Sequence, residues 1–290
     1  MNVQHSFLSS QPIEKLIEHG CQLLTPCSDS AKLDAQILLC QVLKQELSYL
    51  LTWPEKLIAP PIVEHYLNLL SRRQIGEPIA YITGTKEFWS LPLMVSTATL
   101  IPRPDTEILV EKVLEVYDGK NNVSCLDLGT GTGAIALALA SENLTWSVEG
   151  IDFSFDAVAL AKKNAKTLQL SRVSFYQSDW FSNVAQGIKF DLIVSNPPYI
   201  DEYDENLSQG DVRFEPKSAL VSQSSGLADI KHIAKLSLKF LVNSGRLFFE
   251  HGFDQGEAVR EVMLNLGYKK VQTIKDLSGH DRVTWATFEN

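Results

Sequence analysis

The sequence predicts an α/β protein in which a parallel β-sheet, covered by helices on both faces, follows a small helical bundle. Two observations lead to this fold class. Beyond Pro104, short apolar strands alternate with helical patterns, which is typical of a parallel sheet. Before residue 77, apolar residues recur only at helical spacing. The 290 residues exceed the usual size of one domain, so two unequal domains are compatible with this division.

The helical periodicity of residues 1–76 predicts a bundle of long helices. Pro12 stands where a proline commonly opens a helix. Residues 28–30 (Ser-Asp-Ser) offer an N-cap for a helix over 31–43, and Pro60 with Pro61 opens a third helix that ends near Gly76. The bundle carries no catalytic signature. We therefore expect an N-terminal helical domain at 1–76 that binds the substrate.

A change of composition follows the bundle. Residues 79–100 are rich in β-branched and aromatic side chains and are interrupted by Gly84 and Pro92. This composition predicts a β-hairpin. We expect a hairpin linker at 77–104 and a second domain at 105–290.

The second domain alternates predicted strands and helices. Its last two strands have no helix between them, which predicts an antiparallel edge to the sheet. The predicted strands are 123–128, 147–151, 173–176, 190–194, 245–250, 269–274 and 282–288, and the predicted helices are 134–140, 155–168, 230–241 and 255–266.

Composition and charge exclude several classes of protein. The net charge of −9 argues against an enzyme that binds duplex nucleic acid through many lysines and arginines. No apolar run reaches the roughly 20 residues that span a bilayer. Residues 1–5 (Met-Asn-Val-Gln-His) show no basic start before an apolar run, so we expect no secretory signal and a cytoplasmic location. The four cysteines form no CxxC pair, and we expect no metal site and no disulfide framework.

A glycine-rich turn follows the first strand of the second domain. Asp127, Gly129, Thr130, Gly131, Thr132 and Gly133 lie between that strand and the next predicted helix. Ligands of open α/β sheets bind outside the carboxyl ends of the strands. Glycines in such a turn let the backbone approach a ligand closely. The glycines alone do not separate a dinucleotide from S-adenosyl-L-methionine.

Residues at two further positions distinguish between these cofactors. Asp152 ends the second strand, where a carboxylate can accept both ribose hydroxyls or can cap the next helix. After the third strand, Asp179 can accept from an adenine amino group, and the indole of Trp180 can cover the adenine ring. A dinucleotide enzyme also needs a hydride-acceptor site, for which we find no candidate. The pattern favours S-adenosyl-L-methionine.

An Asn-Pro-Pro-Tyr motif ends the fourth strand, at Asn196, Pro197, Pro198 and Tyr199. Two consecutive prolines fix the backbone in an extended form. They leave the Asn196 side chain and the Pro197 carbonyl as rigid acceptors, which suit the two N–H groups of an amide or an exocyclic amine. Tyr199 would stack on a flat amide. The motif therefore predicts methyl transfer to an amide or amine nitrogen.

Five segments together resemble the HemK/PrmC family of peptide chain release factor N5-glutamine methyltransferases. They are residues 101–107 (Ile-Pro-Arg-Pro-Asp-Thr-Glu), 127–133, 178–180, 196–199 and 210–216 (Gly-Asp-Val-Arg-Phe-Glu-Pro). The resemblance covers nearly the whole chain. It implies a seven-stranded Rossmann-like class I methyltransferase sheet, the cofactor S-adenosyl-L-methionine, and action on the GGQ motif of release factors in translation termination.

The resemblance also implies roles for individual residues. Asn196, Pro197 and Tyr199 would be catalytic, and Asn196, Pro197, Pro198 and Tyr199 would bind the substrate glutamine. Residues 103–107 would border the methionine end of the cofactor. The cofactor-binding residues would be Asp127, Gly129, Thr130, Gly131, Thr132, Gly133, Asp152, Asp179, Trp180 and Asn196.

Other functions remain open at this stage. A glutamine methyltransferase for ribosomal protein L3 would share the glycine turn and the Asn-Pro-Pro-Tyr motif, although residues 104–107 resemble the release-factor branch. An adenine-N6 nucleic-acid methyltransferase would use the same acceptor pair, but the acidic balance disfavours stable nucleic-acid binding. A non-enzymatic cofactor sensor or adaptor would not need an intact Asn196–Tyr199 motif.

Three more residues are candidates for a role. Arg213 and Glu215 lie in a polar loop after the motif, where they could contact a protein substrate or form a salt bridge. His251 follows a predicted strand end, and we expect it to be a structural hydrogen-bonding residue rather than a base.

Overall fold

The computed structural model describes residues 9–290 and divides them into two compact units. The first unit comprises residues 9–84 and Ser208–Phe214, and the second comprises Thr85–Leu207 and Glu215–Asn290. The expectation about a secretory signal at residues 1–5 lies outside the described residues. No helix within 9–290 is long and apolar enough to cross a membrane.

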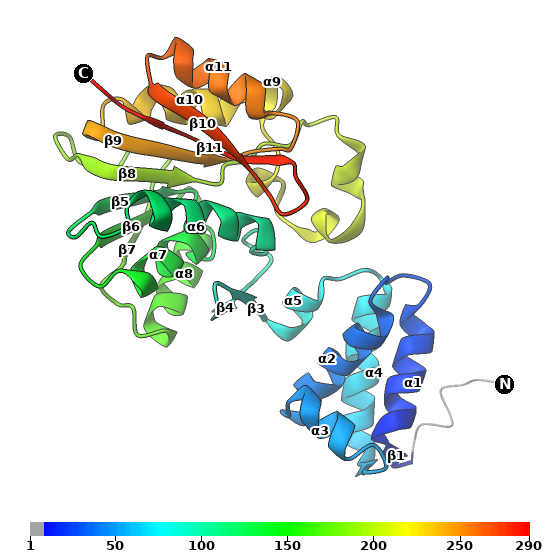
Figure 1. The fold of residues 1–290 in the computed structure, drawn as a ribbon. Coiled ribbons are helices and arrows are strands. Elements are labelled where there is room, and N and C mark those ends of the chain that lie inside the picture. The colour runs from blue at the N-terminus through cyan, green and yellow to red at the C-terminus, as the bar shows by residue number, and fades with distance from the viewer. Residues whose placement is uncertain (1–8) are drawn as a thin grey trace. The chain divides into compact units, whose positions relative to one another are not determined.

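The first unit is a helical bundle, as predicted (Figure 1). Proline residues precede α1 and open α4, because their fixed φ suits the start of a helix and they need no N–H partner there. A two-residue antiparallel ladder joins β1 and β2. The elements are β1 (Gln11–Pro12), α1 (Ile13–Leu24), α2 (Ala31–Leu43), α3 (Leu47–Thr52), β2 (Leu57–Ile58), α4 (Pro60–Gln74) and α5 (Ile79–Thr83), together with the 3-10 turn η4 (Gly210–Phe214).

Close helix packing and one buried ion pair stabilise the bundle. A Cβ at Gly20 would lie 2.2 Å from the Tyr66 hydroxyl, so only glycine fits where α1 meets α4. Asp34 on α2 is 4% exposed and accepts hydrogen bonds from the side chains of Ser28, Ser30 and Arg73. The Arg73 bond, 2.8 Å long, ties α2 to α4.

The structure corrects the start of the predicted hairpin. Residues 79–83 form helix α5, and the hairpin comprises only β3 (Thr85–Phe88) and β4 (Leu91–Met94). Three residues of α5 are buried, and this burial in the tertiary structure outweighs the β propensity of the segment. Gly84, with φ of 75°, ends the helix in the left-handed conformation. Trp89 and Ser90 both have positive φ, as a tight two-residue hairpin turn requires.

The second unit contains the predicted seven-stranded sheet, in the order β10-β11-β9-β8-β5-β6-β7. Neighbouring strands from β7 to β9 are parallel, and β11 is antiparallel to both β9 and β10, which confirms the predicted antiparallel edge. The strands are β5 (Ser124–Leu128), β6 (Ser147–Asp152), β7 (Ser174–Gln177), β8 (Phe190–Ser195), β9 (Leu241–Glu250), β10 (Lys269–Lys275) and β11 (Asp281–Thr287).

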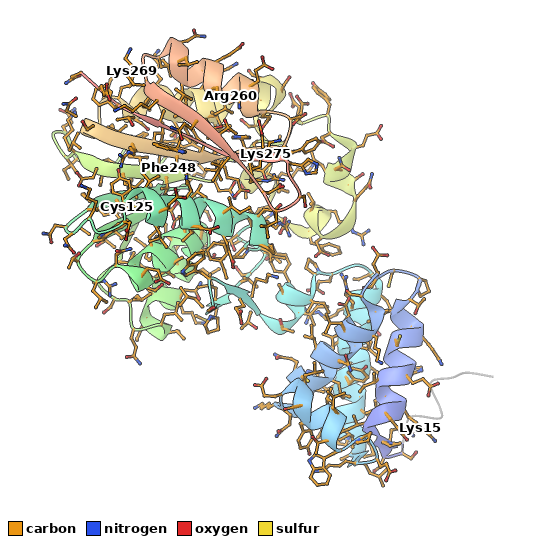
Figure 2. All side chains as sticks on the ribbon, viewed as in Figure 1. Lys15, Cys125, Phe248, Arg260, Lys269 and Lys275 are labelled. Carbon is orange, nitrogen blue, oxygen red and sulfur yellow. The ribbon has the colours of Figure 1, made fainter. Side chains whose placement is uncertain are left out.

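Helices cover both faces of this sheet (Figure 1). One apolar cluster joins alternate strand residues to α6, α7 and α8, and a second joins the opposite face to α10 and α11. Cys125 and Phe248, labelled in Figure 2, belong to the first cluster. The helices are α6 (Glu107–Val116), α7 (Ala134–Glu142), α8 (Phe155–Thr167), α9 (Gln223–Gly226), α10 (Ala228–Ser237) and α11 (Gly256–Asn265), with 3-10 turns η2 (Pro104–Thr106), η3 (Glu205–Ser208) and η5 (Lys217–Ala219).

The strand order places one edge of the sheet where a ligand site is expected. The central strand β5 has β6 on one side and β8 on the other, so successive strands are added first on one side of β5 and then on the other, while all three run parallel. Leu128 at the end of β5 pairs with Ile151 on one side and Ser195 on the other. The segments that follow these three strands therefore leave the sheet at the same level, at a topological switch point.

Candidate active site

A cavity of about 410 Å³ opens at this edge of the second unit. Its volume lies within the roughly 300–1,000 Å³ range of small-molecule sites. The predicted residues that line it are Arg103, Thr106, Gly129, Thr130, Gly131, Thr132, Asp152, Asp179, Trp180, Asn196 and Pro198. The other predicted residues are not part of the lining, and they are Pro104, Asp105, Glu107, Asp127, Gly133, Pro197 and Tyr199.

The glycine turn has a backbone that other residues rarely adopt. Gly129, Gly131 and Gly133 have φ values of 72°, 55° and 85°. A Cβ at Gly133 would lie 3.1 Å from both Leu137 and Phe175, so this glycine permits close helix packing behind the cavity. A Cβ at Gly131 would meet nothing closer than 4.0 Å, which places open space beside that residue.

Asp127 lies behind the turn rather than in the cavity wall. Its Oδ2 accepts from the Thr130 hydroxyl at 2.6 Å and from the Ala136 N–H at 3.3 Å. Its Oδ1 is buried and has no hydrogen-bond partner within residues 9–290. Burial raises the pKa of Asp127 to about 7. The carboxylate therefore fixes the turn, and one of its oxygens remains unpaired.

Asp152 combines the two roles that its position suggested. Its Oδ1 accepts from the Ser154 N–H at 2.8 Å, and its Oδ2 accepts from the Gly131 N–H at 2.9 Å. Burial raises the pKa of Asp152, and the two backbone N–H groups oppose that shift. A carboxylate has about four lone-pair sites, so each oxygen can accept another bond from a ligand in the cavity.

Two aromatic residues flank the space beside Asp152. Trp180 has φ of 44°, and its ring lies 3.6 Å from where a Cβ of Gly129 would stand. Phe153 also lines the cavity and is 71% exposed. Phe153 was not among the predicted site residues, although its place at the end of a parallel strand was a usable signal.

The Asn-Pro-Pro-Tyr segment is held by its own side chains and by residues from other elements. Asn196 Nδ2 donates to the Thr106 hydroxyl oxygen at 3.2 Å, which leaves Oδ1 as the free acceptor of the amide. The Tyr199 hydroxyl donates to Glu250 Oε1 at 3.2 Å. The Tyr199 carbonyl accepts from Gln255 Nε2 at 2.9 Å. Burial raises the pKa of the Tyr199 hydroxyl, which keeps it a proton donor.

Arg213 and Glu215 do not pair with each other. Glu215 is 5% exposed and accepts from Arg103 Nη2 at 2.6 Å and from the Ile101 N–H at 3.0 Å. It thereby anchors the segment that carries Arg103, which lines the cavity. Arg213 belongs to the first unit and donates to the Ile75 carbonyl at 2.7 Å.

His251 is a buried structural residue, as expected. Its Nδ1 lies 2.8 Å from the Gly252 carbonyl, and its Nε2 lies 2.8 Å from the Thr284 hydroxyl. Burial lowers the pKa of His251, so the neutral ring is favoured. Among residues 9–290, no group of three or more His, Cys, Asp or Glu side chains is arranged to bind a metal.

The second unit has the fold of the class I methyltransferases. Solved structures share the fold: a methyltransferase from Pyrococcus furiosus covers 77% of this chain and 99% of its own (TM-score 0.54, 17% identity). A Thermus thermophilus 16S rRNA methyltransferase, solved with S-adenosyl-L-methionine and guanosine, covers 71% of this chain and 50% of its own (TM-score 0.52, 18% identity).

Sequence comparison identifies the particular family. Residues 15–84 match the family described as PrmC N-terminal domain, and residues 89–215 match the methyltransferase small domain. The release factor glutamine methyltransferase of Vibrio cholerae is 56% identical over 92% of this chain and 93% of its own length. That of Escherichia coli is 51% identical over 89% and 92%. The chain belongs to the family of release factor glutamine methyltransferases.

Proposed function

We propose that the protein transfers a methyl group from S-adenosyl-L-methionine to the side-chain amide nitrogen (N5) of the glutamine in the GGQ motif of peptide chain release factors. The observation that carries this proposal is the position of Asn196. It ends β8 at the cavity, and its amide nitrogen is engaged by Thr106. The oxygen of the same amide is then available to a substrate N–H.

The cavity residues fit the cofactor chemically. Asp152 can accept ribose hydroxyls, Asp179 can accept the adenine amino group, and Trp180 and Phe153 can cover the adenine ring. The open space at Gly131 allows close approach to the backbone. When bound, S-adenosyl-L-methionine supplies an electrophilic methyl group on a sulfonium.

The Asn196 and Pro197 oxygens act on the substrate nitrogen. A glutamine nitrogen is a poor nucleophile because its lone pair is delocalised into the carbonyl. If both N–H groups donate to these oxygens, the nitrogen is held with its remaining face toward the methyl donor. Positive charge then grows on the nitrogen, and fixed carbonyl dipoles stabilise that charge more in the transition state than in the ground state.

Tyr199 and the solvent complete this scheme. Tyr199 is held by its bonds to Glu250 and Gln255, so its ring can stack on the flat amide. The nitrogen loses a proton to solvent only after methylation, when that proton has become acidic. The site therefore needs no strong base, which agrees with a structural role for His251.

We also propose a division of labour along the chain. Residues 1–76 bind the release factor, residues 77–104 form the linker, and residues 105–290 bind the cofactor and perform the transfer. Leu51, Trp53 and Leu57 are candidate contacts in the first domain, since they are 68%, 56% and 64% exposed. A cytoplasmic location and the absence of stable nucleic-acid binding belong to the same proposal.

The alternatives are less well supported. A ribosomal protein L3 methyltransferase would use the same acceptors, but the relatives at 51–56% identity over most of the chain are release factor enzymes by name. An adenine-N6 methyltransferase would need affinity for nucleic acid, and a net charge of −9 disfavours it.

A substrate panel tests the proposal. Purified release factor, with its GGQ glutamine intact or replaced, is incubated with labelled S-adenosyl-L-methionine beside ribosomal protein L3 and DNA. We expect label on the intact release factor only. Transfer to L3 or DNA, with none to the release factor, would assign the protein to one of the alternatives.

A further inference from the structure

One oxygen of a carboxylate behind the Asn-Pro-Pro-Tyr segment has no role in the mechanism above. Glu250 is the last residue of β9 and is 1% exposed. Its Oε1 accepts from the Tyr199 hydroxyl. Its Oε2 is buried, and no group within residues 9–290 meets it in full hydrogen-bond geometry. Burying a carboxylate in this way is costly, so the position requires an explanation.

Thr106 lies between this carboxylate and the catalytic asparagine. It is 4% exposed, and its hydroxyl oxygen accepts from Asn196 Nδ2 at 3.2 Å. The same hydroxyl is close enough to Glu250 to lower the pKa of the carboxyl by hydrogen bonding, against the larger effect of burial, which raises it. Two hydrogen bonds, from Asn196 to Thr106 and from Tyr199 to Glu250, and the electrostatic contact of Thr106 with Glu250 link these four residues of the second unit, which we call the polar chain.

The chemistry of these groups decides which of them donates and which accepts along the polar chain. An ionised carboxylate only accepts hydrogen bonds, and a hydroxyl has one proton to donate. If Thr106 donates to Glu250, its lone pairs face Asn196 and attract the amide nitrogen. The amide oxygen of Asn196 then faces the cavity. A reversed amide would present Nδ2 to the substrate N–H groups, and two donors would oppose each other.

We propose that Glu250 is a positioning residue that orients the Asn196 amide through Thr106 and holds the ring of Tyr199 directly. The proposal rests on the proposed function, because it explains how the acceptor for the substrate nitrogen is selected. Arg282, whose Nη2 lies 3.0 Å from Asp276 and 3.6 Å from Asp105, adds positive charge near the Glu250 carboxylate and favours its ionised form.

Glu250→Gln tests the direction of hydrogen bonding along the polar chain, with little change in the shape of the side chain. A glutamine amide can donate as well as accept, so Thr106 is no longer required to donate and the Asn196 amide can reverse. We expect kcat for methyl transfer to fall by about 10- to 100-fold, as for other small losses of alignment. The dissociation constant for S-adenosyl-L-methionine, measured by calorimetry, and the KM for release factor should change less than about threefold, because neither depends on the amide orientation.

Two substitutions at Thr106 separate orientation from packing. Thr106→Ser keeps the hydroxyl and should retain most of kcat, whereas Thr106→Val keeps the shape, removes the hydroxyl and should match the loss in Glu250→Gln. The double variant Glu250→Gln with Thr106→Val should be no slower than the slower single variant, because both break one chain. Ser237→Ala is the matched control, since Ser237 is equally buried on α10 and lies outside the site; its kcat should be unchanged.

The series is run on whichever substrate the wild-type enzyme labels in the panel above. Lack of transfer to release factor by the wild type contradicts the proposed function alone. A wild-type kcat in Glu250→Gln overturns the inference alone. If Glu250→Gln fails to fold by circular dichroism, equal kcat in Thr106→Ser and Thr106→Val overturns it instead.

Discussion

Asp34 in the helical unit and two strand-end carboxylates in the sheet unit differ in their hydrogen bonds. In the helical unit, Asp34 accepts from Ser28, Ser30 and Arg73, so both of its oxygens are paired. In the sheet unit, Asp127 and Glu250 each keep one buried oxygen without a full hydrogen bond among the described residues. A fully paired carboxylate stabilises a fold, whereas an unpaired one costs free energy. The difference indicates that Asp34 serves the fold of its unit, while the strand-end carboxylates serve the site.

The largest expected effect lies at the site. Asn196→Ala removes an acceptor aligned on the substrate nitrogen, and we expect kcat to fall by about 10²- to 10³-fold. Binding of S-adenosyl-L-methionine, measured by calorimetry, should be largely retained. Unchanged turnover would contradict the acceptor role, and a matching loss of cofactor affinity would show that Asn196 serves binding instead.

The second prediction concerns the removal of the paired carboxylate Asp34. Asp34→Ala leaves Arg73, whose side chain is only 13% exposed, with the longer 3.4 Å contact to Asp211 as its remaining ion pair, so we expect the free energy of unfolding to fall by roughly 3 kcal/mol at most. Urea denaturation measures this loss, and exposed Asp29→Ala is the control. The kcat per folded molecule should not change, and a reduced kcat at full folding would mean that Asp34 also serves the site.

The third prediction concerns the cofactor end of the cavity. Asp152→Ala removes a carboxylate that lines the cavity, and we expect the dissociation constant for S-adenosyl-L-methionine to rise by roughly 10- to 100-fold, as for the loss of a charged hydrogen bond of about 1.5–3 kcal/mol. Calorimetry measures it. An unaltered constant would rule out the ribose role and leave Asp152 as a support for the Gly131 and Ser154 backbone.

The last prediction is a dependence of stability on pH. Because burial raises the pKa of Asp127 to about 7, the folded state binds this proton more tightly than the unfolded state. The contribution is fully present below the unfolded pKa and is lost as the pH rises through 7, at up to about 1.4 kcal/mol per pH unit. Denaturation of the cofactor-free protein between pH 5 and 8 should show that Asp127→Asn has a flatter profile than the wild type. Equal slopes would contradict the raised pKa.

Much of the fold could be predicted from the sequence, because the strands and their turns are local signals. Alternating apolar strands and helices predicted the sheet and its antiparallel edge. Helix α6 is absent from the sequence prediction. Its residues 107–116 follow directly on the motif at 101–107, and that motif was interpreted as part of the site rather than as the start of a helix. Helix α5 was assigned to the hairpin, since its five residues, mostly β-branched or aromatic, are too few to show helical periodicity.

The site likewise contains features that could be predicted from the sequence and features that could not. Most residues that line the cavity on the glycine turn and after the strands were predicted, because they follow strand ends in the sequence, although Phe153 was not. Residues 103–107 were also predicted to border the cofactor. The contacts of Thr106 with Asn196 and of Glu250 with Tyr199 were not predicted, because they join positions 90 and 51 residues apart. Such pairings depend on the packing of η2 and β9 beside β8. A single sequence carries no direct record of that packing.

The most direct test of the central claim is to locate the transferred methyl group. Release factor is incubated with wild-type enzyme or Asn196→Ala at saturating S-adenosyl-L-methionine, and the modified residue is identified by fragment mass spectrometry. We expect one added methyl on the side-chain nitrogen of the GGQ glutamine with the wild type, and a large loss of that product with Asn196→Ala at equal cofactor binding. A methyl group on another residue, or equal yield from the two enzymes, would contradict it.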